Sequence, residues 1–412
     1  MKYLILVGDG MGDYPLDELG GKTPLAAAKT PTMDALCGQG ELFFAQTVPD
    51  GYPPGSDVAN MSLLGYDPAR YYTGRAPFEA AAMGVPLAAD EIAFRCNLVT
   101  LDYDFSTGQA KMVDFAAGHI SNAESHQLIA ALQEGCGSAM FHFYPGVSYR
   151  HLLVMKGEHP GFVPVPPHDH SGQDVSAYFN DYLRLPAWRE LMTKAGAVLA
   201  GHPVNAARQK AGKKPATMIW PWGEGKASAM PTLTDRFGIT GTMVSAVDLL
   251  KGLGVVGGLK VVNVPGATGY IDTNYAGKAQ AAIDALATQD FVFVHLEGPD
   301  EAGHQGLLAD KMQAIENFDG KIVAPIIAAL RQKDDAFRVL ITMDHFTPMA
   351  LRTHSRDAVP VLLYDSRRET ALGLPLDKPF CEQACQDEAR RTGAMPMIGH
   401  ELLARLLEKK EN

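Results

Sequence analysis

Short apolar runs alternate with helix-like stretches along most of the chain, and several of the runs are bounded by glycine or proline. Each run is about as long as one β-strand. The strands predicted in this way cover residues 3–7, 217–220, 242–247, 260–264, 291–296, 337–343 and 358–364. Strands that alternate with helices predict an α/β fold with a mostly parallel sheet flanked by helices.

The pattern changes in the middle of the first half of the chain. Apolar and polar residues alternate there in three strand-like runs that surround one helix-like stretch, at residues 92–100, 141–144, 149–155 and 122–132. This pattern predicts a smaller, mainly antiparallel α+β domain inserted into the parallel-sheet domain. We therefore expect an inserted domain at residues 89–173 and a catalytic domain formed by residues 1–88 and 174–412.

Polar residues with metal-ligand chemistry follow one of the later strands. The run 291–296 is stopped by Gly298 and Pro299, so Asp300 lies in the loop at the carboxyl end of a strand, where open α/β sheets bind their ligands. His304 is four residues further on, which places both side chains on one face of a helix. A carboxylate and an imidazole so placed could hold a divalent ion, or they could be ordinary polar residues of a helix N-terminus.

A second strand end repeats this chemistry. Asp344 and His345 directly follow the run 337–343, and His354 precedes the run 358–364. Two strand ends that carry Asp and His, together with a third His, predict a metal site with more than one ion. The alternative is a set of polar loop residues in an ordinary sheet protein.

The loop after the first strand contains a third acid, Asp9, between glycines. The sequence Gly8-Asp9-Gly10-Met11-Gly12 resembles half of a dinucleotide-binding fingerprint, but its third glycine is misplaced and Pro15 follows. We instead expect the glycines to clear space around Asp9, so that its carboxylate can approach an ion closely.

Ser56 follows a turn made by Pro53, Pro54 and Gly55, at the start of a helix predicted over residues 56–64. A serine in this place is most often a helix N-cap. A helix N-terminus also directs N–H groups at whatever the side chain bonds, which suits a phosphoserine. Beside metal ligands, the hydroxyl can lose its proton and become a nucleophile.

Composition narrows the classes of partner. The chain has 412 residues, 46% of them hydrophobic, and a net charge of -11, which argues against nucleic acid but not against a small phosphorylated substrate. No apolar run approaches the ~20 residues of a membrane span, and the first is too short for a signal peptide. The five scattered cysteines predict reduced thiols in a cytoplasmic protein: Cys37, Cys96, Cys136, Cys381 and Cys385.

Taken together, these motifs resemble those of the alkaline phosphatase superfamily, in the same order along the chain. More narrowly, the whole chain resembles the archaeal-type cofactor-independent phosphoglycerate mutases, including the segments at residues 220–226 and 264–270. The resemblance implies two divalent ions, of manganese, magnesium or zinc, and a phosphoserine at Ser56. The ligands it implies are Asp9, Ser56, Asp344 and His345 for one ion and Asp300, His304 and His354 for the other.

The resemblance also implies an activity, the interconversion of 3-phosphoglycerate and 2-phosphoglycerate, with the inserted domain as a lid that keeps water from the phosphoserine. The substrate contacts expected in the inserted domain and the cleft are Arg95, Arg150, His168 and Lys226. The oligomeric state is left open.

Two positions depart from the mutases and keep an alternative open. His119 stands where the mutases commonly have Arg, and Phe346 where they have Ser, and both features are closer to a bacterial branch of proposed homoserine kinases. Loss of an Arg removes a bidentate partner for a phosphate or carboxylate. The alternatives are therefore a homoserine kinase that uses ATP and a related metal-dependent phosphatase.

Overall fold

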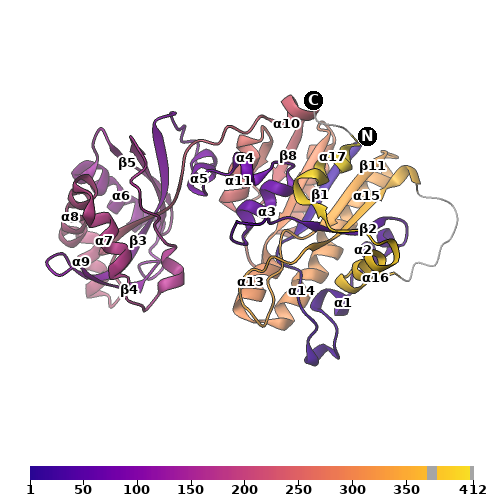
Figure 1. Ribbon diagram of the computed structural model, residues 1–412, viewed down its shortest axis with the longest axis horizontal. Coiled ribbons are helices and arrows are strands. Elements are labelled where there is room, and N and C mark those ends of the chain that lie inside the picture. Colours follow the sequence, from indigo (N-terminus) through magenta and orange to yellow (C-terminus); the bar gives the residue numbers. More distant parts are fainter. Residues whose placement is uncertain (369–377, 409–412) are drawn as a thin grey trace. The chain divides into compact units, whose positions relative to one another are not determined.

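The computed structural model describes residues 1–368 and 378–408, and the chain divides into two compact units (Figure 1). Unit 1 comprises Met1–Tyr72 and Met230–Asn412, and unit 2 comprises Thr73–Ala229. Both ends of the chain belong to unit 1, so unit 2 is an insertion.

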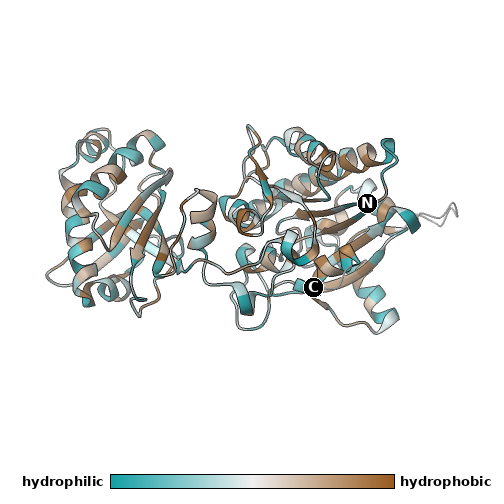
Figure 2. Cartoon of the chain, turned by 90° about the horizontal axis from the view of Figure 1, so that it is seen from above, coloured by the Kyte–Doolittle hydropathy of each residue, from teal (hydrophilic) through white to brown (hydrophobic). Residues whose placement is uncertain are grey.

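Unit 1 is built on one sheet in which parallel pairs prevail. β1 (Lys2–Gly8) pairs in parallel with both β10 (Phe291–Leu296) and β11 (Phe337–Thr342), whose residues are all buried. The other strands, in order outward from β11, are β12 (Val359–Asp365), β2 (Glu41–Gln46) and β13 (Met397–Ile398), and, outward from β10, β8 (Gly241–Val244) and β9 (Lys260–Val262). Figure 2 shows these strands as mainly hydrophobic.

Helices pack against this sheet. α12 contacts β10, α11 contacts β8, and α2 and α16 contact β12. The helices of unit 1 are α1 (Pro24–Ala27), α2 (Pro31–Cys37), α3 (Ser56–Leu63), α4 (Pro68–Tyr71), α10 (Leu233–Phe237), α11 (Asp248–Val256), α12 (Tyr275–Leu286), α13 (Gly298–Gln305), α14 (Leu308–Phe318), α15 (Ala324–Gln332), α16 (Glu382–Thr392) and α17 (Leu402–Leu407), with a π-helical turn η3 (Asp319–Val323) joining α14 to α15.

The strand register brings three loops to one edge of the sheet. Gly8 lies opposite Leu296, and Val7 lies opposite Thr342, so β1, β10 and β11 end at the same level. Asp9 follows β1, α13 begins just after β10, and Asp344 lies shortly after β11. The polar residues predicted at strand ends therefore lie together.

Unit 2, whose residues are all described, contains a sheet in which every strand pair is antiparallel. Its long strand β3 (Glu91–Asp104) pairs with three others, and its core includes Phe94, Trp188 and Trp220. The remaining elements of unit 2 are α5 (Ala76–Ala82), β4 (Gln109–Asp114), α6 (Asn122–Cys136), β5 (Phe141–Val147), β6 (Arg150–Lys156), α7 (Ser176–Arg184), α8 (Pro186–Gly201), α9 (Pro203–Lys210) and β7 (Met218–Gly225).

The predicted fold class is confirmed: a mostly parallel α/β sheet flanked by helices, with an inserted α+β unit. The predicted boundaries of the insertion, 89 and 173, differ from those observed. β7 pairs with β3, and Phe179, Tyr182 and Trp188 complete the core of unit 2, so the insertion continues to Ala229. Helices that alternate with a strand after residue 174 resemble the α/β pattern in sequence, although the strand joins the antiparallel sheet.

Candidate active site

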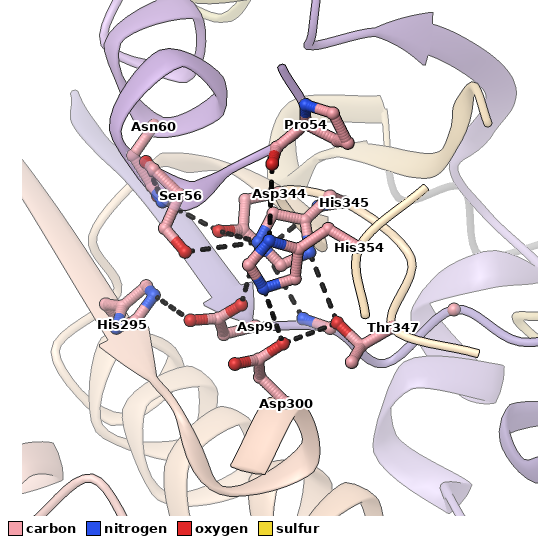
Figure 3. Close-up of polar contacts among 12 residues, drawn as sticks. Asp9, Pro54, Ser56, Asn60, His295, Asp300, Asp344, His345, Thr347 and His354 are labelled. Atoms are coloured by element: carbon pink, nitrogen blue, oxygen red, sulfur yellow. Dashed lines mark hydrogen bonds and ion pairs between the residues drawn. The ribbon is translucent and has the colours of Figure 1, made fainter. Parts of the chain in front are cut away.

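The loops at the carboxyl edge of the large sheet bring the predicted ligands together (Figure 3). Gly10 has a φ of +61°, and its amide donates to Asp344 Oδ1 over 3.3 Å. A Cβ on Gly10 would lie 2.6 Å from Thr347 Oγ1 and 2.7 Å from the Cα of Asp300. Only glycine allows the first loop to approach the other two this closely. That the glycines also let the Asp9 carboxylate approach an ion stays a prediction.

Asp300, His304 and His354 form the first of the ligand clusters. His304 Nε2 lies 3.3 Å from Asp300 Oδ2 and 2.9 Å from His354 Nε2, and His354 Nε2 lies 3.5 Å from Asp300 Oδ1. The Nδ1 atom of His304 lies 3.0 Å from the backbone carbonyl oxygen of Arg352, and the Nδ1 atom of His354 lies 3.3 Å from that of Pro54. Carbonyls that accept from Nδ1–H leave each Nε2 as the ligand atom, the usual arrangement of metal-binding histidines.

The electrostatics of this cluster favour a cation. A hydrogen bond to Asp300 raises the pKa of His304 to about 9, against the opposing effect of burial. Burial alone would lower the pKa of His354, but its hydrogen bond to Asp300 produces a net rise. Burial alone would raise the pKa of Asp300, but the two imidazoles hold it well below its usual range. Without a metal, protons supply the positive charge that an ion would otherwise supply.

We expect a metal ion entering this cluster to release protons. His304 is protonated below a pKa of about 9 in the metal-free protein, and only its neutral form can bind an ion, so metal affinity should rise with pH up to that value. Addition of Mn²⁺ to weakly buffered metal-free protein at pH 7 should release about one more proton from the wild type than from His304→Gln.

The matched control for this titration is His126→Gln, which changes an exposed imidazole of unit 2 that lies 2.8 Å from the carbonyl oxygen of Gly146. It should release as many protons as the wild type. Equal release by His304→Gln and the wild type would show that His304 is not a ligand.

Asp9, Asp344 and His345 form a second, fully buried cluster. His345 Nε2 lies 3.4 Å from Asp344 Oδ2 and 3.6 Å from Asp9 Oδ1. Burial and the nearby Asp344 charge raise the pKa of Asp9 well above its usual value, and Oδ1 of Asp9 has no hydrogen-bond partner among the described residues. Two buried carboxylates and an unpaired oxygen fit a divalent ion in this place.

Ser56 is the first residue of α3, and Gly55 is its N-cap. The hydroxyl of Ser56 therefore does not act as the cap that serine most often forms. Its Oγ lies 3.1 Å from His345 Nε2, beside the buried cluster (Figure 3). The proline-glycine turn and the start of the helix thus direct the hydroxyl at the predicted ligands.

Two residues that the sequence did not single out connect these groups. Asn60 donates to Asp344 Oδ2 over 2.8 Å and to the carbonyl of Ser56 over 2.9 Å. Thr347 donates to Asp300 Oδ1, and its Oγ1 lies 3.3 Å from His345 Nδ1. The spacing of Asn60, four residues after Ser56 on one helix, is a signal that could have identified it; Thr347 carries no comparable signal.

The four predicted substrate contacts all lie in unit 2. Arg95 is buried between Glu79, 3.0 Å from its Nε, and the ring of Trp222, 4.2 Å from its guanidinium carbon. The ring of His168 is also close to Trp222, with 5.4 Å between centroids. Lys226 is exposed, and its backbone carbonyl accepts from Thr73. The structure thus groups Arg95 and His168 around one tryptophan and leaves the Lys226 side chain apart from them.

Glu79 lies near three arginine side chains, and one of them, Arg75, was not among the predicted substrate contacts. Its Oε1 accepts from Arg75 Nε over 3.0 Å, while Oε2 pairs with Arg95. Burial would raise the pKa of Glu79, but Arg95, Arg75 and the more distant charge of Arg150 lower it. Three guanidinium groups around one carboxylate leave a local excess of positive charge, which suits an anion.

Clusters of candidate metal ligands around a serine hydroxyl, at the carboxyl edge of a mostly parallel sheet, are the arrangement expected of an α/β enzyme of metal-dependent phosphoryl transfer. The chain is 50% identical over 365 residues to a 2,3-bisphosphoglycerate-independent phosphoglycerate mutase of Methanosarcina barkeri, a match that covers 88% of this chain and 90% of that one. The chain belongs to the family of 2,3-bisphosphoglycerate-independent phosphoglycerate mutases.

Further comparisons agree with this family. Residues 38–205 match the profile described as 2,3-bisphosphoglycerate-independent phosphoglycerate mutase. A probable mutase of that description from Geobacter sulfurreducens is 48% identical and covers 99% of this chain and 100% of its own. The solved cofactor-independent mutase of Thermoplasma acidophilum superposes with a TM-score of 0.62 at 27% identity, covering 99% of each chain, and the PH0037 protein of Pyrococcus horikoshii with 0.80 at 29%, covering 100% and 98%.

The family and the ligand clusters together indicate use of divalent metal ions and a small phosphorylated substrate. The relatives named above are mutases and do not favour the kinase alternative. Among the described residues, none of the helices has both the length and the apolar character of a membrane-spanning segment.

Proposed function

We propose that this chain interconverts 3-phosphoglycerate and 2-phosphoglycerate through a phosphoserine at Ser56. The observation that carries the proposal is the position of the Ser56 hydroxyl at the N-terminus of α3, 3.1 Å from His345 Nε2 and beside buried carboxylates. A hydroxyl so placed lies between the candidate metal ligands and the N-terminal end of a helix, whose dipole favours a phosphate.

The proposal includes two divalent ions, of manganese, magnesium or zinc, all of which carboxylate and imidazole ligands accept. When bound, the ions would lower the pKa of the Ser56 hydroxyl and offset the charge of the transferring group. We assign one ion to Asp9, Ser56, Asp344 and His345, from their mutual distances, and the other to Asp300, His304 and His354.

In this mechanism Ser56 Oγ, having lost its proton, attacks the phosphorus of 3-phosphoglycerate in line with the departing oxygen. The bond between phosphorus and the 3-oxygen breaks as the bond to Oγ forms, and the 3-oxygen takes up a proton. The 2-hydroxyl then loses its proton and attacks the phosphorus of the phosphoserine, the bond between phosphorus and Oγ breaks, and Oγ takes up a proton, which restores Ser56. Meanwhile Asn60 holds the carboxylate of Asp344, and the N–H groups of α3 face the phosphoryl oxygens.

We assign the retained glycerate to the positive side chains of unit 2. Arg95 presents its terminal nitrogens beside Trp222, and its Nε is held by Glu79. Burial lowers the pKa of Arg95 to about 10, so the guanidinium is still charged at neutral pH. Arg75 and Arg150 add positive charge, and His168 lies by the same tryptophan. A carboxylate is the part of the glycerate that a guanidinium fork recognises.

Two further parts of the proposal concern the inserted unit and the location of the protein. That unit 2 acts as a lid stays a prediction, which substrate-dependent changes in small-angle scattering would test. A cytoplasmic location is favoured by the five buried cysteines, which are all unpaired. No nucleic-acid partner is expected from the net charge of -11.

The test of this function is conversion of 3-phosphoglycerate without any nucleotide. We expect the metal-loaded protein to form 2-phosphoglycerate in a coupled assay, chelation to abolish the activity, and a divalent ion to restore it, because the ions are needed at both displacements. No conversion of 3-phosphoglycerate, together with loss of ATP that depends on homoserine, would assign the chain to the kinase alternative. Full activity of the metal-free protein would contradict the metal centre.

A further inference from the structure

His295 lies beside the metal centre and has no role in the mechanism above. It is the fifth residue of β10, and its ring is buried with 1% exposure. Neither ring nitrogen has a hydrogen-bond partner within the described residues. Its Nε2 nevertheless points at Asp9, 3.0 Å from Oδ2 (Figure 3).

A core histidine normally satisfies its nitrogens, because a buried polar atom without a partner costs about 1–3 kcal/mol. His151, a buried histidine of unit 2, accepts a hydrogen bond at Nδ1 from the amide of Gly146, and only its Nε2 has no partner among the described residues. His295 lacks even one such bond in the described chain, although Asp9 is adjacent. The geometry is therefore that of a ligand atom aimed at a site, and not that of a packed core residue.

The two oxygens of Asp9 face two different imidazoles. Oδ1 lies 3.6 Å from His345 Nε2, and Oδ2 lies 3.0 Å from His295 Nε2. Ligand atoms of Asp9, His295 and Asp344 all lie within 4.8 Å of one another. Two ligands that are each about 2.1 Å from one ion and at a right angle to each other lie about 3.0 Å apart. The 3.0 Å between Asp9 Oδ2 and His295 Nε2 is compatible with two adjacent ligands of one octahedral ion.

We propose that His295 is a direct ligand, through Nε2, of a divalent ion held by Asp9 and Asp344. The inference rests on the proposed metal centre and adds to it a nitrogen donor on the side of Asp9 opposite His345. Because His345 already supplies one imidazole beside the two carboxylates, His295 would add a second and move the donor set further from one suited to magnesium toward one suited to zinc. His295 would thus help to decide which metal the centre accepts.

The test uses the full chain labelled with ¹⁵N-histidine, first chelated and then loaded with zinc as a diamagnetic probe. Long-range ¹H–¹⁵N spectra report each ring nitrogen, and the His295 signals are those lost in His295→Phe. We expect the Nε2 resonance of His295 to shift on zinc binding together with those of His304, His345 and His354. Zinc affinity of His295→Phe should fall at least about 10- to 100-fold, the range found when even an orienting partner is removed.

His151→Phe is the matched control, since it removes a buried imidazole of unit 2 and should leave zinc binding unchanged. If His295→Phe does not fold, His295→Gln identifies the signals and the wild-type spectra decide. A His295 Nε2 resonance that stays in place while the other three shift would overturn the inference alone. Absence of any shift in all four would overturn the proposed metal centre as well.

Discussion

Ser56→Ala is expected to lower turnover by about four orders of magnitude or more, because the nucleophile acts as a unit with the groups around it and nothing replaces it. The fold should be unaffected. Gly55 caps α3 and Ser56 Oγ does not, so the substitution should cost less than the ~1 kcal/mol of a lost N-cap. Intact-mass measurement after incubation with 3-phosphoglycerate should find one added phosphate on the wild type and none on the variant.

Ser62→Ala is the matched control on the same helix. Ser62 is buried, and its hydroxyl donates to the carbonyl of Val58 and not to a member of the ligand clusters. This variant should keep both the phosphate adduct and most of the turnover. A phosphate that maps to a residue other than Ser56, or a Ser56→Ala protein with most of its rate, would show that the nucleophile is assigned wrongly.

Lys311→Met is expected to destabilise the protein by about 3–5 kcal/mol, the usual cost of breaking a buried ion pair. Lys311 has no exposed surface, and its ammonium donates to Asp13 Oδ2 over 2.7 Å and to the carbonyls of Gly12 and Thr347 over 3.2 and 2.8 Å. It therefore joins the loop that carries Asp9 to the loop that carries His345. Removing it leaves a buried carboxylate without its cation and separates two sets of metal ligands.

Urea denaturation of the metal-free protein measures this effect. Lys251→Met is the control, because the pair of Lys251 with Asp248 is partly exposed and should contribute less than about 1 kcal/mol. The double variant Asp13→Asn/Lys311→Met should recover part of the stability, since no buried charge is then left unpaired. If Lys311→Met were no more destabilising than Lys251→Met, the two loops would not depend on this pair. Metal affinity should also fall in Lys311→Met and not in Lys251→Met.

Much of the metal centre could be predicted from local patterns. Each apolar run that is followed by a polar loop predicted where a strand ends. Because the parallel strands end at one edge of the sheet, Asp9, Asp300 and Asp344 lie together there. The spacing of Asp300 and His304 placed both on one face of α13, as observed. These features follow from helix and strand periodicity, which depends on residues close together in the chain.

The cluster of arginine side chains around Glu79 and the extent of unit 2 could not be predicted in this way. Arg75 is the N-cap of α5, which carries Glu79, while Arg95 and Trp222 belong to two strands far apart in the chain. The packing of α5 on β3 and the pairing of β3 with β7 bring these side chains together. The same pairing moves the boundary of the insertion to Ala229. A strand's pairing partner depends on the other strands of the sheet, so it cannot be predicted from the residues of that strand alone.

By itself, the sequence determined the α/β class, the strand-end acids, the helix that begins at Ser56 and the family to which the chain belongs. Only the tertiary structure decided that the hydroxyl of Ser56 faces His345, that Asn60 and Thr347 hold the predicted ligands, and that the ring of His295 points at Asp9. The reason is physical: periodicity states on which face of an element a side chain lies, whereas the partner it meets there depends on the register between elements that are hundreds of residues apart.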